Sequence, residues 1–228
     1  MKTILLFGAT GLVGGHVLRL ALHDPRVARV VAPVRRALPA EAAADAARAR
    51  RAELQAPVVD FDALPAEADW WRADAAVCAL GTTLKKAGSQ AAFRRVDVDM
   101  VVDTATLARR HGTPAFALNS SLGADAGARG FYLRCKGEAE DALRALDFPS
   151  LTLVRPSLIG GERDESRPLE RLGLVAARVF RPLIPARYRV VAAEDIARCL
   201  LECALTAQPG ERVVESEAIG TTPSPPHP

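Results

Sequence analysis

Tyr132 and Lys136 are the residues whose types and spacing best suit proton transfer. They lie four positions apart at the start of a helical pattern that runs from residue 131 to about residue 145, so both side chains are expected on one face. A free phenol has a pKa of about 10, and a neighbouring ammonium favours the phenolate. Beside a nicotinamide, Tyr132 would therefore protonate a carbonyl oxygen as hydride leaves the cofactor. Because the chain has two tyrosines and four lysines, this pairing rarely arises by chance. The plain alternative is a surface pair without a chemical role.

A hydroxyl group for the same oxygen comes from Ser120 and Ser121, which follow an apolar run at residues 114–118. Ser121 would hold the carbonyl oxygen, and Lys136 would both tune Tyr132 and hold the ribose of the cofactor. Ser121 lies 11 positions before Tyr132, and Ser120 lies 12 positions before it. The sequence leaves open which serine acts, and we prefer Ser121.

Gly8, Gly11 and Gly14 form a turn between the apolar run at residues 3–7 and a helical pattern. Glycine lets the backbone adopt positive φ and approach a ligand closely, and a helix N-terminus presents free N–H groups and a positive dipole end. These properties suit a diphosphate. The first two glycines are three positions apart, which is wider than in the common G-x-G-x-x-G fingerprint. A Walker P-loop is excluded, because no Lys-Ser or Lys-Thr pair follows the last glycine. The alternative is a glycine-rich turn that holds no ligand.

Arg35 and Arg36 end the second apolar run, residues 27–34. In dinucleotide-binding folds this position faces the adenine ribose, where an acid accepts from a 2′-hydroxyl and a basic residue accommodates a 2′-phosphate. The sequence offers two arginines and no acid, and a guanidinium matches a phosphate with two parallel hydrogen bonds. NADP(H) is therefore favoured over NAD(H), unless the arginines only cap a strand in solvent.

Two further strand ends are expected to contact the cofactor. Asp60 and Phe61 follow the third apolar run and should lie near the adenine edge, with a surface turn as the alternative. Gly81 and Thr82 follow the fourth run. Ligands bind at the carboxyl ends of the strands in open α/β sheets, so this second pair is expected at the site.

The order of elements predicts an α/β fold. Six apolar runs read as strands, at residues 3–7, 27–34, 58–59, 74–80, 114–118 and 151–155, and residues 212–214 could close the sheet edge. Helical patterns fall at residues 40–53, 65–71, 89–110, 131–145 and 194–205. Strands separated by helices form right-handed crossovers, which predicts a Rossmann-type, doubly wound parallel sheet.

We expect one NAD(P)-binding domain over residues 1–218 and a flexible tail over residues 219–228. Within the domain, the arginine-rich stretch at residues 162–189 interrupts the alternation of strands and helices and is expected to form a substrate lid. An amphipathic stretch of this kind could instead contact anionic lipid or a protein partner. The oligomeric state is left open.

Composition limits the class of protein. The chain has 228 residues, of which 49% are hydrophobic and 25% charged, as in ordinary globular proteins. It has no apolar run long enough for an integral membrane segment and no secretory signal pattern, so we expect a cytoplasmic protein. A net charge of +3 without a recognition motif argues against a nucleic-acid partner.

The cysteines and histidines predict no metal site. Cys78, Cys135, Cys199 and Cys203 match neither a disulfide framework nor a zinc site, and the four histidines are scattered. Cys199 and Cys203 lie four positions apart on an apolar helix and are expected to be buried free thiols.

Together these motifs resemble those of the short-chain dehydrogenase/reductase superfamily. The similarity is closer to its atypical, Tat-interacting-protein-like oxidoreductase branch, and it is carried by FGATGLVGG, CALGTTLKKAG, FRRVDVDMV, LNSSLGA, FYLRCKGEAE and VRPSLIGGERDESRP. The resemblance covers nearly the whole chain up to about residue 205. Both serine spacings are slightly short of the superfamily pattern, and the preference for Ser121 follows that pattern.

The resemblance implies a Rossmann fold with bound NADPH and Ser/Tyr/Lys chemistry. It also places the 2′-phosphate on Arg35 and Arg36, and the carboxamide near Pro156 and Ser157. The cofactor-binding residues expected in this way are Gly8, Thr10, Gly11, Leu12, Val13, Arg35, Arg36, Asp60, Phe61, Leu80, Gly81, Thr82, Tyr132, Lys136, Pro156 and Ser157.

The function that these residues predict is NADPH-dependent reduction of a small carbonyl compound. Two alternatives stay open. One is a regulatory or redox-sensing protein that binds NADPH with little turnover, since members of the branch are associated with such roles. The other is a nucleotide-sugar epimerase or dehydratase, for which the region after Ser157 is short.

Overall fold

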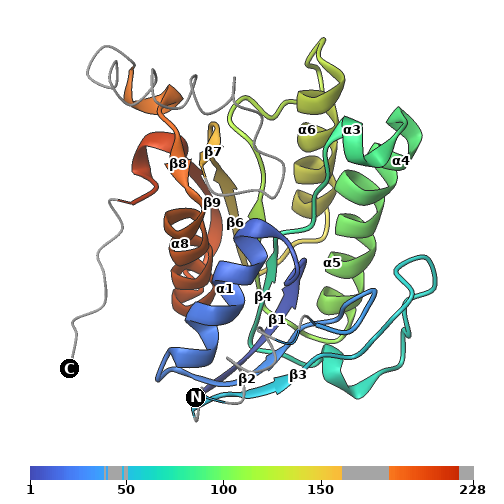
Figure 1. Cartoon of the computed structure of the whole chain (residues 1–228), viewed down its shortest axis with the longest axis vertical. Helices are drawn as coiled ribbons and strands as arrows, with labels where there is room; N and C mark the ends of the chain where they lie inside the picture. The colour runs from blue at the N-terminus through green and yellow to red at the C-terminus, as the bar shows by residue number, and fades with distance from the viewer. Residues whose placement is uncertain (39, 41–47, 49–50, 161–184, 221–228) are drawn as a thin grey trace.

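The computed structural model describes residues 1–38, 40, 48, 51–160 and 185–220. Seven parallel strands form the main sheet in the order β3-β2-β1-β4-β5-β6-β9 (Figure 1). They are β1 (Lys2–Phe7), β2 (Val27–Val31), β3 (Glu53–Gln55), β4 (Ala75–Cys78), β5 (Ala115–Asn119), β6 (Ser150–Arg155) and β9 (Gly210–Glu215). A second, two-stranded sheet pairs β7 (Ile159–Gly160) with β8 (Val191–Ala192).

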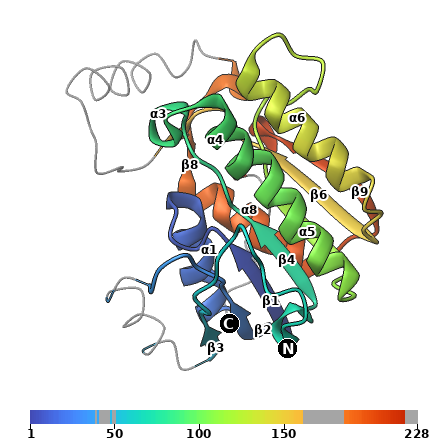
Figure 2. The ribbon, with the colours of Figure 1, turned by 90° about the vertical axis from the view of Figure 1, so that its right-hand side faces the viewer.

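Helices cover both faces of the sheet (Figure 2). The α-helices are α1 (Leu12–His23), α3 (Leu84–Ala87), α4 (Gln90–Arg94), α5 (Met100–Arg110), α6 (Phe131–Arg144) and α8 (Ala193–Thr206). A π-helical turn, η2 (Arg95–Asp99), joins α4 to α5, and the 3₁₀ turns are η1 (Asp69–Trp71), η4 (Ala186–Tyr188) and η5 (Ser216–Ala218). The expected Rossmann-type, doubly wound parallel sheet is confirmed.

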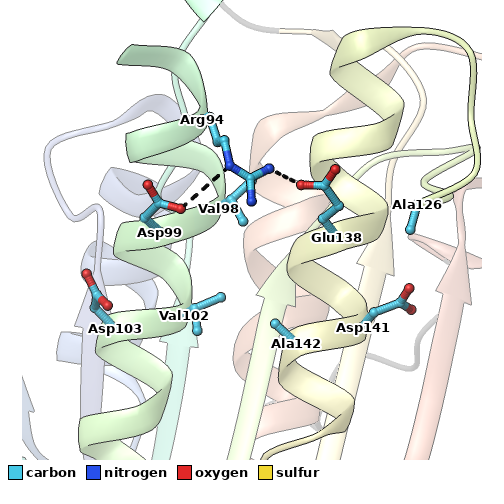
Figure 3. Close-up of a pocket in the computed structure, with 9 residues that line it drawn as sticks. All are labelled: Arg94, Val98, Asp99, Val102, Asp103, Ala126, Glu138, Asp141 and Ala142. Atoms are coloured by element: carbon cyan, nitrogen blue, oxygen red, sulfur yellow. Dashed lines mark hydrogen bonds and ion pairs between the residues drawn. The ribbon is translucent and has the colours of Figure 1, made fainter. Parts of the chain in front are cut away.

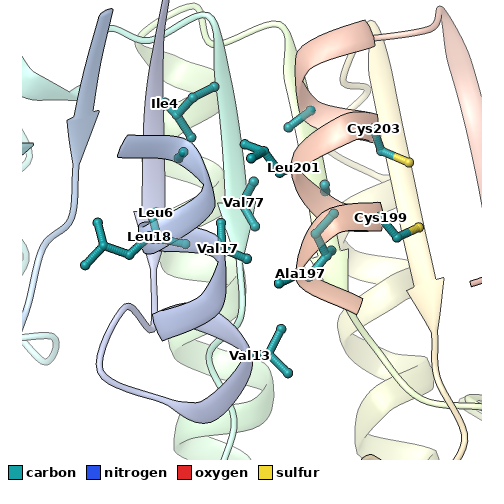
Figure 4. Packing of buried hydrophobic residues seen from close by; sticks show 14 of the residues in the cluster. Ile4, Leu6, Val13, Val17, Leu18, Val77, Ala197, Cys199, Leu201 and Cys203 are labelled. Carbon is teal, nitrogen blue, oxygen red and sulfur yellow. The ribbon is translucent and has the colours of Figure 1, made fainter. Parts of the chain in front are cut away.

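Successive side chains along each strand point to opposite faces of the sheet, so the hydrophobic core is divided into two layers, one on each face. In β1, Ile4 and Leu6 pack with α1 and α8 on one face, whereas Leu5 and Phe7 pack with α5 and α6 on the other. Figure 4 shows the first of these layers, in which α1 and α8 lie side by side over the same face of the sheet and Val17 of α1 belongs to the cluster between them. All of these strand residues are fully buried, as expected for a parallel sheet covered on both sides.

The strand order reverses between β1 and β4, because β2 lies on one side of β1 and β4 on the other. In open α/β sheets, ligands bind in the crevice at the carboxyl ends of two strands where the order reverses in this way. Of the residues proposed for cofactor binding, those from Gly8 to Val13 follow β1, and Leu80, Gly81 and Thr82 follow β4.

Several boundaries near the third strand differ from expectation. The third strand is Glu53–Gln55 and not residues 58–59, since Val58 makes only an isolated bridge to Val34 and is 62% exposed. The second strand accordingly stops at Val31. The helix expected at residues 40–53 lies mostly outside the described residues, and its expected end at Glu53 is wrong because that residue opens β3.

The helix expected at residues 89–110 exists but contains a π-helical turn in its middle. This turn, Arg95–Asp99, contains the polar Asp97 and its neighbour Val98, which are both buried. The short α3 before this helix was not expected. The tryptophan pair of η1 packs onto the sheet as predicted, and Trp71 Nε1 donates to the carbonyl of Pro65 at 2.8 Å.

The C-terminal half follows the prediction closely. Helices α6 and α8 and strands β6 and β9 agree with the expected segments within a few residues, and β9 closes the sheet beside β6. All four cysteines are buried free thiols. Of the lid expected at residues 162–189, residues 162–184 lie outside the described residues. Residues 221–228 of the expected tail also lie outside them. In the described part of the chain, no helix is both long and apolar enough to cross a membrane.

The close contact between α1 and the end of β1 predicts an asymmetric response to two neighbouring substitutions. A Cβ atom on Gly14 would lie 2.0 Å from the Gly8 carbonyl oxygen, whereas a Cβ on Gly15 would lie 3.6 Å from the Ala9 oxygen. We expect Gly14→Ala to lower the free energy of unfolding in urea by about 2 kcal/mol or more, because backbone must move. Gly15→Ala is the control and should be neutral or stabilising, since alanine favours helix. Equal losses in the free energy of unfolding in the two variants would contradict the close packing of Gly14 against the backbone of Gly8.

Candidate functional site at the carboxyl edge of the sheet

The turn from β1 into α1 brings the helix N-terminus to the crevice. Gly8 has a φ of +86°, and a Cβ there would lie 2.6 Å from the Ala79 carbonyl oxygen, so β1 and β4 end in direct backbone contact. Gly11 is the N-cap of α1, and no side chain caps the helix. The first N–H groups of α1 are therefore not satisfied by a capping side chain, which suits an anionic group.

Lys136 forms a buried ion pair with Asp97 of the π-helical turn. Its Nζ lies 2.7 Å from Asp97 Oδ1, and the Thr82 N–H donates to Asp97 Oδ2 at 2.8 Å. Asp97 is 1% exposed and Lys136 is 5% exposed. Burial disfavours the ammonium, but the carboxylate of Asp97 and the phenol of Tyr132 outweigh it, so the pKa of Lys136 is raised above its ordinary value.

Tyr132 stands one helical turn before Lys136, at the open end of the same face of α6. The Lys136 Nζ lies 6.0 Å from the centre of the Tyr132 ring, and Phe93 packs against that ring with centroids 5.8 Å apart. Tyr132 is 40% exposed, in contrast to the buried lysine. The structure thus brings the pair together and leaves the tyrosine accessible to a ligand.

The two candidate serines have different partners. Ser120 Oγ donates to Glu140 Oε1 at 2.6 Å, in a buried contact. Ser121 Oγ has only a long contact of 3.5 Å with the carbonyl oxygen of its neighbour Leu122. Of the two hydroxyl groups, the one on Ser121 is therefore better placed to bind a substrate oxygen.

Glu140 is a fully buried carboxylate on the same face of α6, one turn after Lys136. Arg155 of β6 donates to it through Nε at 2.9 Å, and this hydrogen bond is the main reason that the pKa of Arg155 is raised. Since Ser120 also donates to Glu140, one carboxylate ties α6 to the ends of β5 and β6.

The loop after β5 is held against α6 by backbone contacts. The Asp125 N–H donates to the Leu133 carbonyl at 3.2 Å, and a Cβ on Gly137 would lie 2.0 Å from the backbone nitrogen of Ala126. The Leu122 N–H donates to the Pro156 carbonyl at 2.8 Å. These contacts fix the loop that carries Ser121 between α6 and the end of β6.

The other residues expected near the nicotinamide half of a cofactor border the same crevice. Leu80 and Gly81 follow β4, and a Cβ on Gly81 would lie 3.4 Å from Asp97 Oδ1, so the loop backbone passes directly over the ion pair. Pro156 is buried after β6, and the Ser157 hydroxyl donates to the carbonyl of Arg189. The loops after β4 and β6 therefore both lie at the carboxyl edge of the sheet.

Arg35 and Arg36, expected at the adenine end of the cofactor, lie after β2, on the other side of β1 from β4. Both are exposed and directly follow the bridge between Val34 and Val58. Asp60 is exposed in the adjoining segment, whereas Phe61 is 4% exposed and belongs to the core. Of the expected adenine-edge pair, only Asp60 offers its side chain to a ligand.

Two observations test whether a dinucleotide suits this crevice. The uncapped N-terminus of α1 stands beside glycine backbone into which no side chain projects, as a diphosphate requires. Asn119, at the carboxyl end of β5, has a buried Oδ1 without a hydrogen-bond partner, which is the state of a group that awaits a donor. The residues present therefore fit such a cofactor.

Other sites in the described residues are less suited to chemistry. No group of three or more His, Cys, Asp or Glu side chains there could hold a metal ion. A groove between α5 and α6 is crossed by Arg94, which pairs with Asp99 at 4.0 Å and with Glu138 (Figure 3). None of the residues proposed for catalysis or cofactor binding lines this groove.

Three site residues were missed from the sequence. Glu140 could have been found, because it continues the four-residue spacing of Tyr132 and Lys136 along one helix face. Asp97 gave a weaker signal as an acid in the middle of an otherwise apolar face, because its cation lies on another helix. Nothing in the sequence distinguished Asn119 from an ordinary strand-end residue.

Comparison with known proteins identifies a family for most of the chain. A family model described as NAD(P)H-binding matches residues 8–207. Protein fmp52, mitochondrial, of Aspergillus clavatus is 34% identical over 232 residues, which covers 96% of this chain and 94% of the relative. Protein HTATIP2 of Rattus norvegicus is 33% identical and covers 96% of this chain and 88% of the relative.

Solved structures with the same fold include nucleotide-sugar enzymes. MoeE5 in complex with UDP-glucuronic acid and NAD has a TM-score of 0.70 at 18% identity, covering 95% of this chain and 76% of that one. The UDP-Glc/GlcNAc 4-epimerase of Campylobacter jejuni has a TM-score of 0.70 at 15% identity, covering 96% and 82%. At these identities the likeness establishes the fold.

The cytoplasmic location expected from the sequence is wrong. Three relatives from Aspergillus and Emericella species, at 34% to 36% identity, are named as mitochondrial proteins, and this finding contradicts the expectation. The expectation rested on the lack of a recognised targeting pattern, and the residues that build a Rossmann core are the same in either compartment.

The buried carboxylate of Glu140 generates a stability prediction. Glu140→Gln removes the buried one of the two carboxylates that pair with Arg155, which keeps Glu215 at 3.3 Å, so we expect a loss of about 2 to 4 kcal/mol, towards the lower end of the cost of breaking a buried pair. The control Glu138→Gln removes a partly exposed partner of Arg94 and should change the free energy of unfolding by about 0.5 kcal/mol or less. Urea unfolding of both variants measures the two losses in the free energy of unfolding. If Glu140→Gln lost no more stability than Glu138→Gln, the contacts of Glu140 would not be needed to hold α6 in place.

Proposed function

Because the chain belongs to the NAD(P)H-binding family, we propose that it is an NADPH-dependent reductase of a carbonyl-containing small molecule. The family is that of atypical short-chain dehydrogenase/reductase proteins, as the similarity to HTATIP2 and fmp52 confirms, and it supports a dehydrogenase/reductase-like enzyme at a coarse level. The observation that supports carbonyl reduction is that Tyr132 and Lys136 lie on the same face of α6. The accessible phenol of Tyr132 is thereby one helical turn from the buried ammonium of Lys136.

In this proposal the chain supplies a proton and holds the substrate oxygen. A nicotinamide cofactor held at this site would supply the hydride that the carbonyl carbon accepts, and would be oxidised in doing so. Tyr132 donates its phenolic proton to the carbonyl oxygen, which completes the alcohol. The Ser121 hydroxyl donates a hydrogen bond to that oxygen, where negative charge develops. Lys136 provides the positive charge that favours the phenolate left on Tyr132.

The preference for NADPH rests on the two exposed arginines after the β2 region. A 2′-phosphate carries charge that a guanidinium meets with two parallel hydrogen bonds, whereas a ribose hydroxyl requires an acceptor. Arg35 and Arg36 are both exposed after the β2 region, and the neighbouring segment holds two acids, Asp60 and Asp62. Asp62 pairs with Arg95 at 2.7 Å, so the two arginines outweigh the remaining carboxylate of Asp60 and favour the phosphorylated ribose.

A nucleotide-sugar epimerase is the second candidate, favoured by the fold neighbours alone. MoeE5 was solved with a UDP-sugar and NAD, but its chain is longer, since this chain covers 76% of it. Sugar isomerisation without net consumption of cofactor would support this candidate over carbonyl reduction. A protein that binds NADPH and shows no turnover would instead act as a regulator.

The two tyrosines allow a matched test of the proposed proton donor. In a screen of aldehydes, ketones and quinones with NADPH, Tyr132→Phe should lower kcat by about 100-fold or more, because the general acid is lost. Tyr188→Phe, in η4, is the comparison: Tyr188 lies in the stretch expected to form the lid, so this variant can change KM but should lower kcat far less than Tyr132→Phe does. Loss of NADPH absorbance reports the rate. Equal rates in the wild type and in Tyr132→Phe would rule out this tyrosine as the acid.

Cofactor choice is tested by removing the two arginines together. Arg35→Ala with Arg36→Ala should weaken NADPH binding by about 10- to 100-fold, the effect of losing charge-assisted hydrogen bonds to a phosphate, and should leave NADH binding unchanged. Exposed Arg72→Ala is the control. Fluorescence titration gives both dissociation constants. The proposed binding of the 2′-phosphate by Arg35 and Arg36 would be contradicted if the double variant bound NADPH as tightly as the wild type does. It would also be contradicted if the wild type bound NADPH and NADH equally tightly.

A further inference from the structure

Two thiols that the proposed reductase chemistry does not use lie together on α8. Cys199 and Cys203 are one helical turn apart, and Figure 4 shows both sulfur atoms on the side of α8 that is turned away from α1. The two side chains are joined by a hydrogen bond. Cys199 is 1% exposed and Cys203 is 6% exposed, so Cys203 is the more accessible member of the pair.

The sheet beneath α8 presents a hydroxyl group and a cation to Cys203. Thr152 of β6 and Arg212 of the edge strand β9 are opposite each other in the strand register. Each lies two positions before a residue of the core layer under α8, namely Val154 and Val214, so both side chains point to the face that α8 covers. Thr152 is buried and hydrogen-bonds to the Cys203 sulfur, whereas Arg212 is exposed and acts through its charge.

These surroundings favour the thiolate form of Cys203. The hydrogen bond from the Cys199 thiol has the largest effect on the Cys203 sulfur. Together with the charge of Arg212 and the hydroxyl of Thr152, it outweighs burial and the nearby carboxylate of Glu202, so the pKa of Cys203 is lowered from its ordinary value.

The other two thiols of the chain are kept in the neutral form. Burial raises the pKa of Cys78 to about 12, and it also raises the pKa of Cys135. Because the thiolate is the form of cysteine that reacts with oxidants, Cys203 should react before either of them.

We propose that Cys203 and Cys199 form an oxidation site for hydroperoxides, in which Cys203 reacts first and Cys199 then closes a disulfide on α8. The Cys203 thiolate attacks one oxygen of hydrogen peroxide, the O–O bond breaks, and the sulfenic acid forms while solvent protonates the hydroxide that leaves. The Cys199 sulfur attacks the sulfenic sulfur, the S–O bond breaks, and the hydroxide leaves as water with the Cys199 proton. The two thiols lose two electrons, and the peroxide is reduced to water.

Closing this disulfide requires a local change in α8. Side chains four positions apart on a helix have Cβ atoms about 5–6 Å apart, whereas a disulfide brings them to about 3.8 Å. The pair lies near the end of α8, where the Ala207 N–H, in the left-handed C-cap, donates to the Cys203 carbonyl at 2.9 Å. We therefore expect the disulfide to loosen the last turn of α8 and to leave its first turns in place.

Peptide mass spectrometry of the native protein tests the proposal. Trypsin cleaves after Arg198 and Arg212, so residues 199–212 carry both thiols in one peptide. The folded protein is treated with hydrogen peroxide and then denatured and alkylated. We expect this peptide to be unalkylated and lighter by two hydrogen atoms than the reduced peptide, and Cys78 and Cys135 to be alkylated. Absence of the disulfide, or oxidation of Cys78 at the same rate, overturns the proposal.

Substitution of each thiol separates the two roles. In Cys199→Ser, the sulfenic acid should persist on Cys203 and be trapped as a dimedone adduct. In Cys203→Ser, neither a disulfide nor an adduct on Cys199 should form, and an adduct there would contradict the order of reaction. Cys135→Ala is the matched control and should form the disulfide as the wild type does.

The contribution of Arg212 is measured by its charge. Arg212→Gln should slow formation of the disulfide by about threefold at about pH 6, because a smaller fraction of Cys203 is thiolate. Arg212→Lys retains the positive charge and should react at nearly the wild-type rate. Equal rates in the wild type and in Arg212→Gln would contradict activation of Cys203 by this cation.

Discussion

One face of α6 places two charges in the protein interior, and each of them needs a partner there. A buried charge is costly unless an opposite charge and hydrogen bonds satisfy it. Lys136 finds Asp97 beside the end of β4, and Glu140 finds Arg155 at the end of β6 and Ser120 at the end of β5. Satisfying these two charges therefore fixes α6 relative to three adjacent strand ends, and with it the position of Tyr132 at the mouth of the crevice.

The cofactor end of the crevice follows from a different constraint, which is close approach of backbone. Gly8 and Gly14 let β1, α1 and the end of β4 meet with no side chain between them. The charged face of α6 and the glycine turn of α1 lie on opposite faces of the sheet, and both open at its carboxyl edge (Figure 1). A dinucleotide that runs along this edge would reach from the exposed arginines to Tyr132, which is why one fold can serve binding and chemistry together.

Local patterns predicted the parts of the site that depend on local periodicity. Tyr132 and Lys136 could be placed on one face because an α-helix sets the direction of side chains four positions apart. Asp97 shares the four-residue spacing of the buried Phe93 and Val101, but hydrophobic spacing does not show that a carboxylate there finds its cation on another helix, in Lys136. The choice between Ser120 and Ser121 depends on Glu140, which is distant in sequence, and the third strand was misplaced because Val58 makes only one bridge. Location in the cell depends on none of these contacts.

The central claim is that a dinucleotide lies along the carboxyl edge of the sheet with its reactive end beside Tyr132. A crystal structure of the protein with NADP⁺ tests it most directly. The predicted result is a diphosphate at the N-terminus of α1, the 2′-phosphate against Arg35 and Arg36, and the nicotinamide ring next to Tyr132 and Ser121. A nicotinamide ring directed away from Tyr132, or a dinucleotide bound elsewhere, would contradict the claim.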